Sequence, residues 1–219
     1  MKPFAWSFSA LSTFESCPKK YWHLTVRKDF KDEDSEASKD GKFIHDALHK
    51  RVINGKPLPL PMRNLEPLAA KFAAADGEKH GEMRLALNEK MAPVAFFAED
   101  TWVRAIVDLL VVQGKRAIIV DWKTGKPKKD FTQMGLCSAV LARWMPEIEE
   151  FETLLVFTGH LKIERKTYSR TDLVGVWNDL LPRVAKITEA RDTTTFPAKE
   201  SGLCGYCPVN TCPYWRERG

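Results

Sequence analysis

The sequence has no uninterrupted apolar run near the ~18 residues that a membrane-spanning helix needs. Its N-terminus lacks the apolar stretch of a secretory signal peptide. Cysteine is scarce, because five residues, an odd number, are too few for a disulfide-rich secreted scaffold. No Gly-x4-Gly-Lys-Ser/Thr phosphate-binding loop is present, so the chain has no nucleotide-driven motor of its own. These absences predict a cytoplasmic protein with no membrane partner.

The composition is that of a globular protein, with 44% hydrophobic and 29% charged residues in 219. A net charge of +5 permits a polyanionic partner without requiring one. Acidic residues crowd the segment from Lys28 to Asp40, which we expect to be a solvated loop. Basic residues cluster just after a predicted strand, at Lys123, Lys126, Lys128 and Lys129.

Apolar periodicity predicts an α/β fold with one mixed central β-sheet flanked by helices. Ser9 is the expected N-cap of the first helix, and Phe43, Ile44, Ala47 and Leu48 are expected to face inward from the second. Helical spacing is found at 9–21, 41–53, 68–75, 131–144 and 171–191. Strand patterns are found at 82–87, 94–98, 102–112, 116–122, 154–157 and 161–168. We expect one domain over 1–219, with a helical part (1–80), a sheet (81–170), a C-terminal helix (171–200) and a cysteine tail (201–219).

A predicted hairpin places two aspartates opposite each other. Gly114-Lys115 suits a two-residue turn, which would pair Asp108 directly with Asp121. Their Cβ atoms would then lie about 4.5–5.5 Å apart. Lys123 follows Asp121 by two residues and so projects from the same face of the strand.

Two carboxylates held together repel each other unless a cation lies between them. Hard oxygen ligands select Mg²⁺ or Mn²⁺, and a neighbouring lysine can orient water or stabilise developing phosphorane charge. Asp108, Asp121 and Lys123 therefore indicate metal-assisted phosphodiester hydrolysis. The alternative is an edge hairpin with a surface salt bridge. The apolar flanks 107–111 and 117–120 argue against that alternative, because they indicate a buried strand.

His45 and His49 lie one helical turn apart, in a pattern superficially like a zinc-protease helix. A protease needs a glutamate where Asp46 stands, and a third ligand that the sequence does not offer. We therefore reject the protease interpretation. His49 is left without a role, and two surface histidines remain an alternative.

The C-terminal cysteines Cys204, Cys207 and Cys212 have the spacing C-x2-C-x4-C, which is typical of a soft-metal site. Three thiolates need a fourth ligand, for which Cys17 is the candidate. Iron–sulfur and zinc both suit four cysteines, and spacing does not choose between them. Cys137 is left over and is expected to be a buried helix residue.

Asp108 with Asp121-Trp122-Lys123 resembles the core of the PD-(D/E)XK nuclease superfamily. Further motifs resemble its RecB-like and Cas4-like branch, in a compact phage or prophage type. They are Ser9-Ala10-Leu11, Cys17-Pro18-Lys19-Lys20-Tyr21-Trp22, Gly41-x3-His45, Glu82-x2-Leu85-x-Leu87, Asp121-Trp122-Lys123-Thr124-Gly125, Gln133 and the cysteine tail. The resemblance extends from Ser7 to Trp215. Two departures are Ala105 in place of a glycine and Cys137 in place of a tyrosine; the second weakens a DNA-binding role for that helix face.

The resemblance implies a restriction-endonuclease-like core and a Mg²⁺- or Mn²⁺-dependent exonuclease acting on single-stranded DNA or DNA ends in recombination or repair. It implies that His45, Glu82, Asp108 and Asp121 hold the metal, that Lys123 positions the attacking water, and that Gln133 orients the lysine or a phosphate. It also implies a [4Fe-4S] cluster on Cys17, Cys204, Cys207 and Cys212, joining the two ends of the chain, with zinc as the less favoured occupant.

Lys126, Lys128 and Lys129 are candidates for DNA phosphate contacts, with a solvated basic loop as the alternative. A helicase or recombination protein is the expected partner, in a bacterial or phage-infected cell. The competing function is a catalytically silent DNA-binding or recombination accessory protein with a structural iron–sulfur or zinc site. The intact set of Asp108, Asp121 and Lys123 argues against it.

Overall fold

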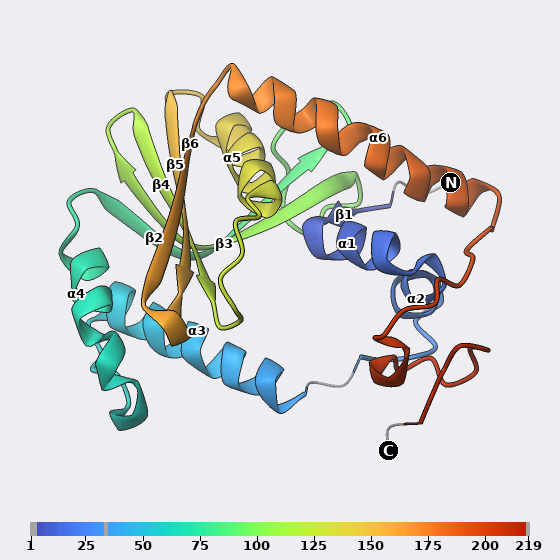
Figure 1. Cartoon of the computed structure of the whole chain (residues 1–219). Coiled ribbons are helices and arrows are strands. Elements are labelled where there is room, and N and C mark those ends of the chain that lie inside the picture. Colours follow the sequence, from blue (N-terminus) through green and yellow to red (C-terminus); the bar gives the residue numbers. More distant parts are fainter. Residues whose placement is uncertain (1–3, 33–34, 218–219) are drawn as a thin grey trace. The chain divides into compact units, whose positions relative to one another are not determined.

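The computed structural model describes residues 4–32 and 35–217, which divide into two compact units (Figure 1). The first unit consists mainly of Glu36–Trp177, and the second combines Trp6–Ser35 with Asn178–Gly219. Glu33 and Asp34 of the expected acidic loop lie outside the described residues. No helix in the described part of the chain is long and apolar enough to span a membrane.

The first unit contains five paired strands, β2 to β6, and the helices that cover them. Its strands are β2 (Glu78–Asn88), β3 (Thr101–Gln113), β4 (Arg116–Lys123), β5 (Glu150–Phe157) and β6 (Lys162–Ser169). Its helices are α3 (Glu36–Asn54), η2 (Leu60–Leu65), α4 (Glu66–Ala74), α5 (Thr132–Trp144) and η3 (Thr158–His160), and α6 (Asp172–Asp192) begins here.

The strands pair in the order β2–β3–β4–β5–β6. The β4–β5 pair is parallel and the other three pairs are antiparallel. This is the mixed central sheet of an α/β fold, as the sequence predicted. Helices α3 and α4 cover one face of the sheet (Figure 1), where α3 packs on Leu109 and Val111 of β3 and on Val120 and Trp122 of β4. Helix α5 lies on the other face.

The second unit brings residues from both ends of the sequence together. Its elements are β1 (Trp6–Ser7), α1 (Phe8–Ser16), α2 (Pro18–Tyr21), η1 (Trp22–Arg27), the later part of α6 and η4 (Cys204–Tyr206). Phe196 stacks on Trp22 with ring centroids 4.5 Å apart and meets Phe14 edge-on at 6.5 Å. These aromatic contacts hold segments from opposite ends of the sequence against each other.

The hairpin register is the predicted one. Gly114 has φ +59°, and the strands pair from Gln113/Arg116 to Leu109/Val120. The paired ladder ends there, one step before Asp108 and Asp121. The two aspartates therefore lie where β3 and β4 begin to separate, although the turn chemistry located them correctly.

Several local predictions were wrong, each for a physical reason. Segment 94–98 forms no strand, because the Ala98 N–H donates to the Ala95 carbonyl in a turn and the Phe96 carbonyl accepts from Arg104 Nε. The N-cap of α1 is Ser7, whose Oγ accepts the Ala10 N–H at 3.3 Å, and not Ser9. Part of the expected acidic loop is helical, because α3 starts at Glu36, an acid placed favourably at the helix N-terminus.

Phe43 does not face inward as predicted. Its side chain is 52% exposed, whereas Ala47 and Leu48 of the same helix are buried. Phe43 lies one helical turn before Ala47, at the edge of the buried stripe and about 140° around the helix axis from Leu48.

Candidate active site

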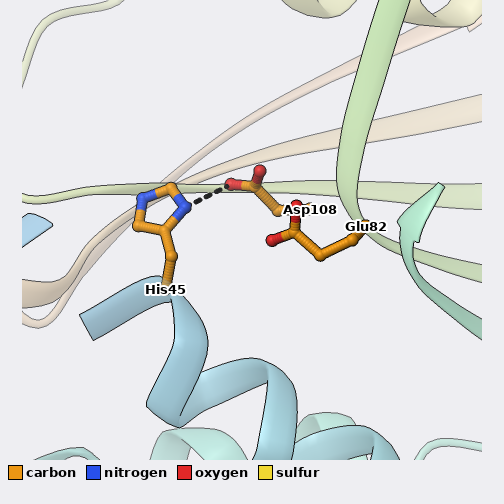
Figure 2. A group of neighbouring side chains, drawn as sticks. All are labelled: His45, Glu82 and Asp108. Carbon is orange, nitrogen blue, oxygen red and sulfur yellow. Dashed lines mark ion pairs between the residues drawn. The ribbon is translucent and has the colours of Figure 1, made fainter. Parts of the chain in front are cut away.

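Three potential metal ligands meet in the first unit, one from each of α3, β2 and β3. Ligand atoms of His45, Glu82 and Asp108 all lie within 4.8 Å of one another. Figure 2 shows the imidazole reaching from α3 towards the two carboxylates, which lie side by side. In the described residues, no other group of three or more histidine, cysteine or acidic side chains is this compact.

Glu82 has an unusual backbone conformation. Its φ is +53°, in the left-handed region that a non-glycine residue occupies at a cost of about 1–3 kcal/mol. The flanking pairs Gly81/Leu109 and Met83/Val107 continue one register, so Glu82 stands opposite Asp108 in the β2–β3 ladder. The strained residue thereby brings its carboxylate to the aspartate on the neighbouring strand.

Asp108 organises both the strand junction and the histidine. Its Oδ2 accepts the backbone N–H of Trp122 at 2.9 Å and lies 3.3 Å from Nδ1 of His45. The hydrogen bond with Asp108 raises the pKa of His45, while partial burial opposes that rise. The same carboxylate oxygen of Asp108 thus contacts both a backbone N–H of β4 and the imidazole of α3.

Asp121 and Lys123 of β4 and Gln133 of α5 form a second, contiguous group. Lys123 Nζ lies 2.7 Å from Asp121 Oδ2 and donates to Gln133 Oε1 at 3.0 Å, and Gln133 Nε2 donates to Asp121 Oδ1 at 3.2 Å. Burial raises the pKa of Asp121 from 3.8 to about 6; the charge of Lys123 opposes the rise and that of Asp108 adds to it. The amide of Gln133 therefore fixes the relative placement of the lysine and the aspartate.

The predicted set of four metal ligands is brought together in part. His45, Glu82 and Asp108 converge, whereas Asp121 lies outside that compact group and is paired with Lys123. The two groups share one site, because Asp108 and His45 both act electrostatically on Asp121.

Gly41 of the predicted histidine motif faces the D-x-K-T-G segment. A Cβ added at Gly41 would lie 3.5 Å from Oγ1 of Thr124, which is ordinary van der Waals contact. The start of α3 therefore lies against the residue that follows Lys123, and the two predicted motifs meet in space.

His49, which the sequence left without a role, packs over β2 beside the site. A Cβ added at Gly81 would lie 2.3 Å from His49 Nδ1 and 2.9 Å from Ile53 Cγ1. Glycine at 81 therefore allows α3 to approach the strand residue that precedes Glu82. The sequence signal for this contact is the helical spacing of His45 and His49, together with a glycine directly before a predicted ligand.

The basic segment after β4 makes ion pairs. Lys128 Nζ lies 3.0 Å from Asp130 and Lys129 Nζ lies 3.4 Å from Glu164, while Lys126 is exposed in the same loop. Two of the three lysines predicted to bind DNA phosphates thus have acidic neighbours, which would compete with a phosphate for the ammonium group.

Cys137 is buried in α5, as predicted. Its thiol donates weakly to the carbonyl of Ile106 at 3.8 Å, and burial raises its pKa to about 12. The negative charges of Asp121 and Asp108 add to that rise, which places the thiol next to the carboxylates. A thiol with this pKa stays protonated and unreactive at neutral pH.

The other four cysteines line one cavity of about 80 Å³ in the second unit: Cys17, Cys204, Cys207 and Cys212. Within the described ranges, no three of their sulfurs lie within 4.8 Å of one another, so they form no compact four-sulfur group. Backbone N–H groups of Lys199 and Ser201 point at the sulfurs of Cys17 and Cys204, at 3.5 and 3.4 Å. Burial raises the pKa of Cys207.

Comparison with known proteins identifies the family to which this site belongs. Residues 5–213 match the profile of the PD-(D/E)XK nuclease superfamily. The chain belongs to this superfamily. The resemblance inferred from Asp108, Asp121 and Lys123 is therefore confirmed at the level of the superfamily.

No curated protein matches the chain. A solved structure from Eubacterium rectale, named "Putative exonuclease", is similar with a TM-score of 0.53 and 12% identity, covering 94% of this chain and 85% of the other. The crystal structure of SSO0001 has a TM-score of 0.43 and 12% identity, covering 96% and 86%. At this identity the E. rectale structure shows a common fold.

Proposed function

We propose that the protein is a divalent-metal-dependent deoxyribonuclease that hydrolyses phosphodiester bonds at the site formed by α3, β2, β3, β4 and α5. The observation that carries the proposal is the convergence of His45, Glu82 and Asp108 within 4.8 Å, in a chain of the PD-(D/E)XK superfamily. Asp121 and Lys123, paired at 2.7 Å, supply the remaining family residues beside them.

The donor chemistry fits Mg²⁺ or Mn²⁺. Carboxylate oxygens are the ligands that hard divalent cations prefer, and one imidazole is compatible with Mn²⁺. Burial of Asp121 near Asp108 disfavours two negative charges, which a cation would neutralise. We propose His45, Glu82, Asp108 and Asp121 as ligands. When bound, the cation would polarise the phosphodiester and make water a stronger acid.

In the proposed reaction, the oxygen of a water molecule forms a bond to phosphorus and the bond from phosphorus to one sugar oxygen breaks. The water loses a proton to solvent and the leaving oxygen gains one. Lys123, held by Asp121 and Gln133, donates a hydrogen bond to the attacking water or to a non-bridging phosphate oxygen. His45 stays oriented by its contact with Asp108.

We further propose that the substrate is single-stranded DNA or DNA ends, that cleavage is exonucleolytic, and that the protein belongs to the RecB-like and Cas4-like branch. Recombination or repair, with a helicase or recombination protein as partner, is the corresponding setting. The motifs around His45, Glu82, Gln133 and the cysteine tail support this finer assignment, and the fold shared with the E. rectale protein is compatible with it.

The direct test uses the whole protein with end-labelled linear and circular DNA, single- and double-stranded, in Mg²⁺, Mn²⁺ or EDTA. We expect metal-dependent cleavage of linear single strands and none of circles. Asp108→Asn and Lys123→Met should reduce cleavage by at least about 100-fold. Glu149→Gln and Lys115→Met, an exposed ion pair at the start of β4 and β5, are matched controls and should cleave like the wild type. Cleavage in EDTA, or wild-type activity of Lys123→Met, would overturn the mechanism.

We also propose that Cys17, Cys204, Cys207 and Cys212 hold a [4Fe-4S] cluster that stabilises the second unit. All four line one cavity, and two backbone N–H groups point at their sulfurs, as expected around bound thiolates. Zinc is the competing occupant.

A further inference from the structure

A row of side chains leads along β2 and β3 away from the carboxylates Glu82 and Asp108. Arg84 of β2 stands directly opposite Ile106 of β3. Because side chains alternate along a strand, Arg104 and Ile106 project from the same face of β3 as Asp108. Ile106 is 43% exposed. The intervening residues, which project from the opposite face, are buried: Val103, Ala105 and Val107.

The row ends at two phenylalanines in the loop between β2 and β3. The Arg104 guanidinium lies 5.4 Å from the ring centroids of both Phe96 and Phe97, and Arg84 lies 5.7 Å from Phe96. Arg104 Nε also donates to the Phe96 carbonyl at 2.7 Å, which fixes the loop to the strand. Phe97 is nevertheless 73% exposed.

The two arginines differ from Arg51, Arg116 and Arg165 of the same unit, which pair with glutamates. Arg116 pairs with Glu150 and Glu152, whereas no described carboxylate forms an ion pair with Arg84 or Arg104. Their guanidinium groups contact aromatic faces and keep donor groups available for an anion. A positive charge beside an exposed aromatic ring is the combination that binds unpaired nucleic-acid strands.

We propose that Arg84, Arg104, Ile106 and Phe97, the Arg–Phe strip, bind the substrate strand on its way to the metal site. Phe97 stacks on an unpaired base, Ile106 contacts the strand through its exposed side chain, and the two arginines bind backbone phosphates. The inference rests on the proposed function and gives it a substrate class, single-stranded DNA. In a duplex the base faces are already stacked, so Phe97 would have no partner.

The spacing along β3 sets where this contact falls on the strand. Arg104 precedes Asp108 by four residues, or about 13 Å of extended strand. The base on Phe97 therefore belongs to a nucleotide a few positions from the bond that is cut. An abasic nucleotide placed at successive positions would locate this contact.

The test measures binding of a labelled 12-nucleotide single strand by fluorescence anisotropy, with the whole protein in EDTA so that the strand is not cut. Phe97→Ala should weaken binding by about fivefold or more, since each stacked base contributes at this level. The loss should disappear when the strand carries one abasic nucleotide at the position that Phe97 contacts. Arg84→Ala should lower the steepness of the salt dependence by about 0.7.

Matched controls come from η2, outside the strip. Leu60 is 72% exposed and Arg63 is also exposed. The variants Leu60→Ala and Arg63→Ala should therefore bind the single strand like the wild type. If Phe97→Ala binds the strand like Leu60→Ala, the proposal that the Arg–Phe strip binds DNA is wrong. The strip is also wrong if Phe97→Ala loses the same affinity with every abasic strand, because the loss would then be structural.

Failure of the strip and failure of the proposed function can be told apart. A protein that cleaves DNA but shows no abasic-sensitive loss in Phe97→Ala overturns only the strip. A protein that never cleaves, yet shows that loss, retains the strip and overturns the nuclease proposal.

Discussion

Asp108 accepts the backbone N–H of Trp122 at 2.9 Å, at the place where β3 and β4 stop pairing with each other. Beyond this point β4 continues alone with β5, through the parallel pairs Asp121/Leu155 and Lys123/Phe157. The carboxylate therefore replaces a ladder hydrogen bond and lets the two strands part. The proposed site occupies the space that this separation opens.

Asp121 should make the metal-free protein less stable as pH rises from about 4 to 6. The pKa of Asp121 is raised from 3.8 to about 6, so the folded state binds the proton more tightly and loses that advantage as pH rises through about 6. His45, whose pKa is raised above 6.5, adds a further decline above that pH. Urea unfolding in EDTA between pH 4 and 8 measures both.

The matched variant for this prediction is Asp121→Asn. It should remove the lower part of the decline and be more stable than the wild type at pH 7 without metal, by on the order of 1–3 kcal/mol. Mg²⁺ or Mn²⁺ should stabilise the wild type at pH 7 and Asp121→Asn much less. If the difference in stability between Asp121→Asn and the wild type stays constant between pH 4 and 6, burial does not raise the pKa of Asp121.

Glu82→Gly should separate backbone strain from ligand function. Glycine accepts φ +53° freely, so this variant should gain about 1 kcal/mol of stability over Glu82→Ala, which keeps the strain. Both lack the carboxylate and should bind Mn²⁺ more weakly than the wild type. Chemical denaturation and Mn²⁺ titration followed by calorimetry give the two values. Equal stability of the two variants would show that residue 82 is not strained.

Gly81→Ala should damage the site although residue 81 is no ligand. Its new methyl group would lie 2.3 Å from His49 Nδ1 and 2.9 Å from Ile53 Cγ1, so we expect α3 to shift away from β2 and to carry His45 with it. We expect weaker Mn²⁺ binding and slower cleavage. The double variant Gly81→Ala/His49→Ala removes the contact with the imidazole and leaves only the 2.9 Å contact with Ile53 Cγ1, so it should recover much of both. If the double variant is no better than Gly81→Ala, this contact does not set the spacing of helix and strand.

The cysteine proposal predicts a brown protein after anaerobic purification, with about four irons per chain. Serine at any one of the four lining cysteines should bleach the colour and lower the melting temperature of the second unit. Cys137→Ser is the control and should keep its colour, because that thiol lies buried in the first unit. A colourless protein with one bound zinc would replace the cluster and leave the nuclease proposal untouched.

Much of the fold was predictable, because it depends on local chemistry. The two-residue turn at Gly114 set the β3–β4 register, alternation located β2, and apolar runs located β3 and β4. Catalytic candidates followed from residue type at fixed spacing. The positive φ of Glu82 and the opening of the ladder at Asp108 were not predictable, since both depend on contacts between strands and a helix distant in sequence.

The Arg–Phe strip has a partial signal in the sequence. Arg104 and Ile106 precede Asp108 at strand spacing, and Arg84 follows Glu82 at the same spacing. The apolar character of segment 94–98 favours a strand and so conceals the loop that carries Phe97. The side chains of Asn88 and Arg104 form hydrogen bonds with the backbone of that loop. Hydrophobic periodicity cannot detect such polar contacts.

The order of the two units along the chain has a consequence for biosynthesis. Glu36–Trp177 is continuous, so the sheet and its carboxylates can assemble while the ribosome is still translating. The cysteine-lined unit forms later, because Cys204, Cys207 and Cys212 follow the whole of Glu36–Trp177 in the sequence. If the four cysteines hold the proposed cluster, its insertion follows synthesis of Cys212, when the carboxylates of the first unit are already in the chain.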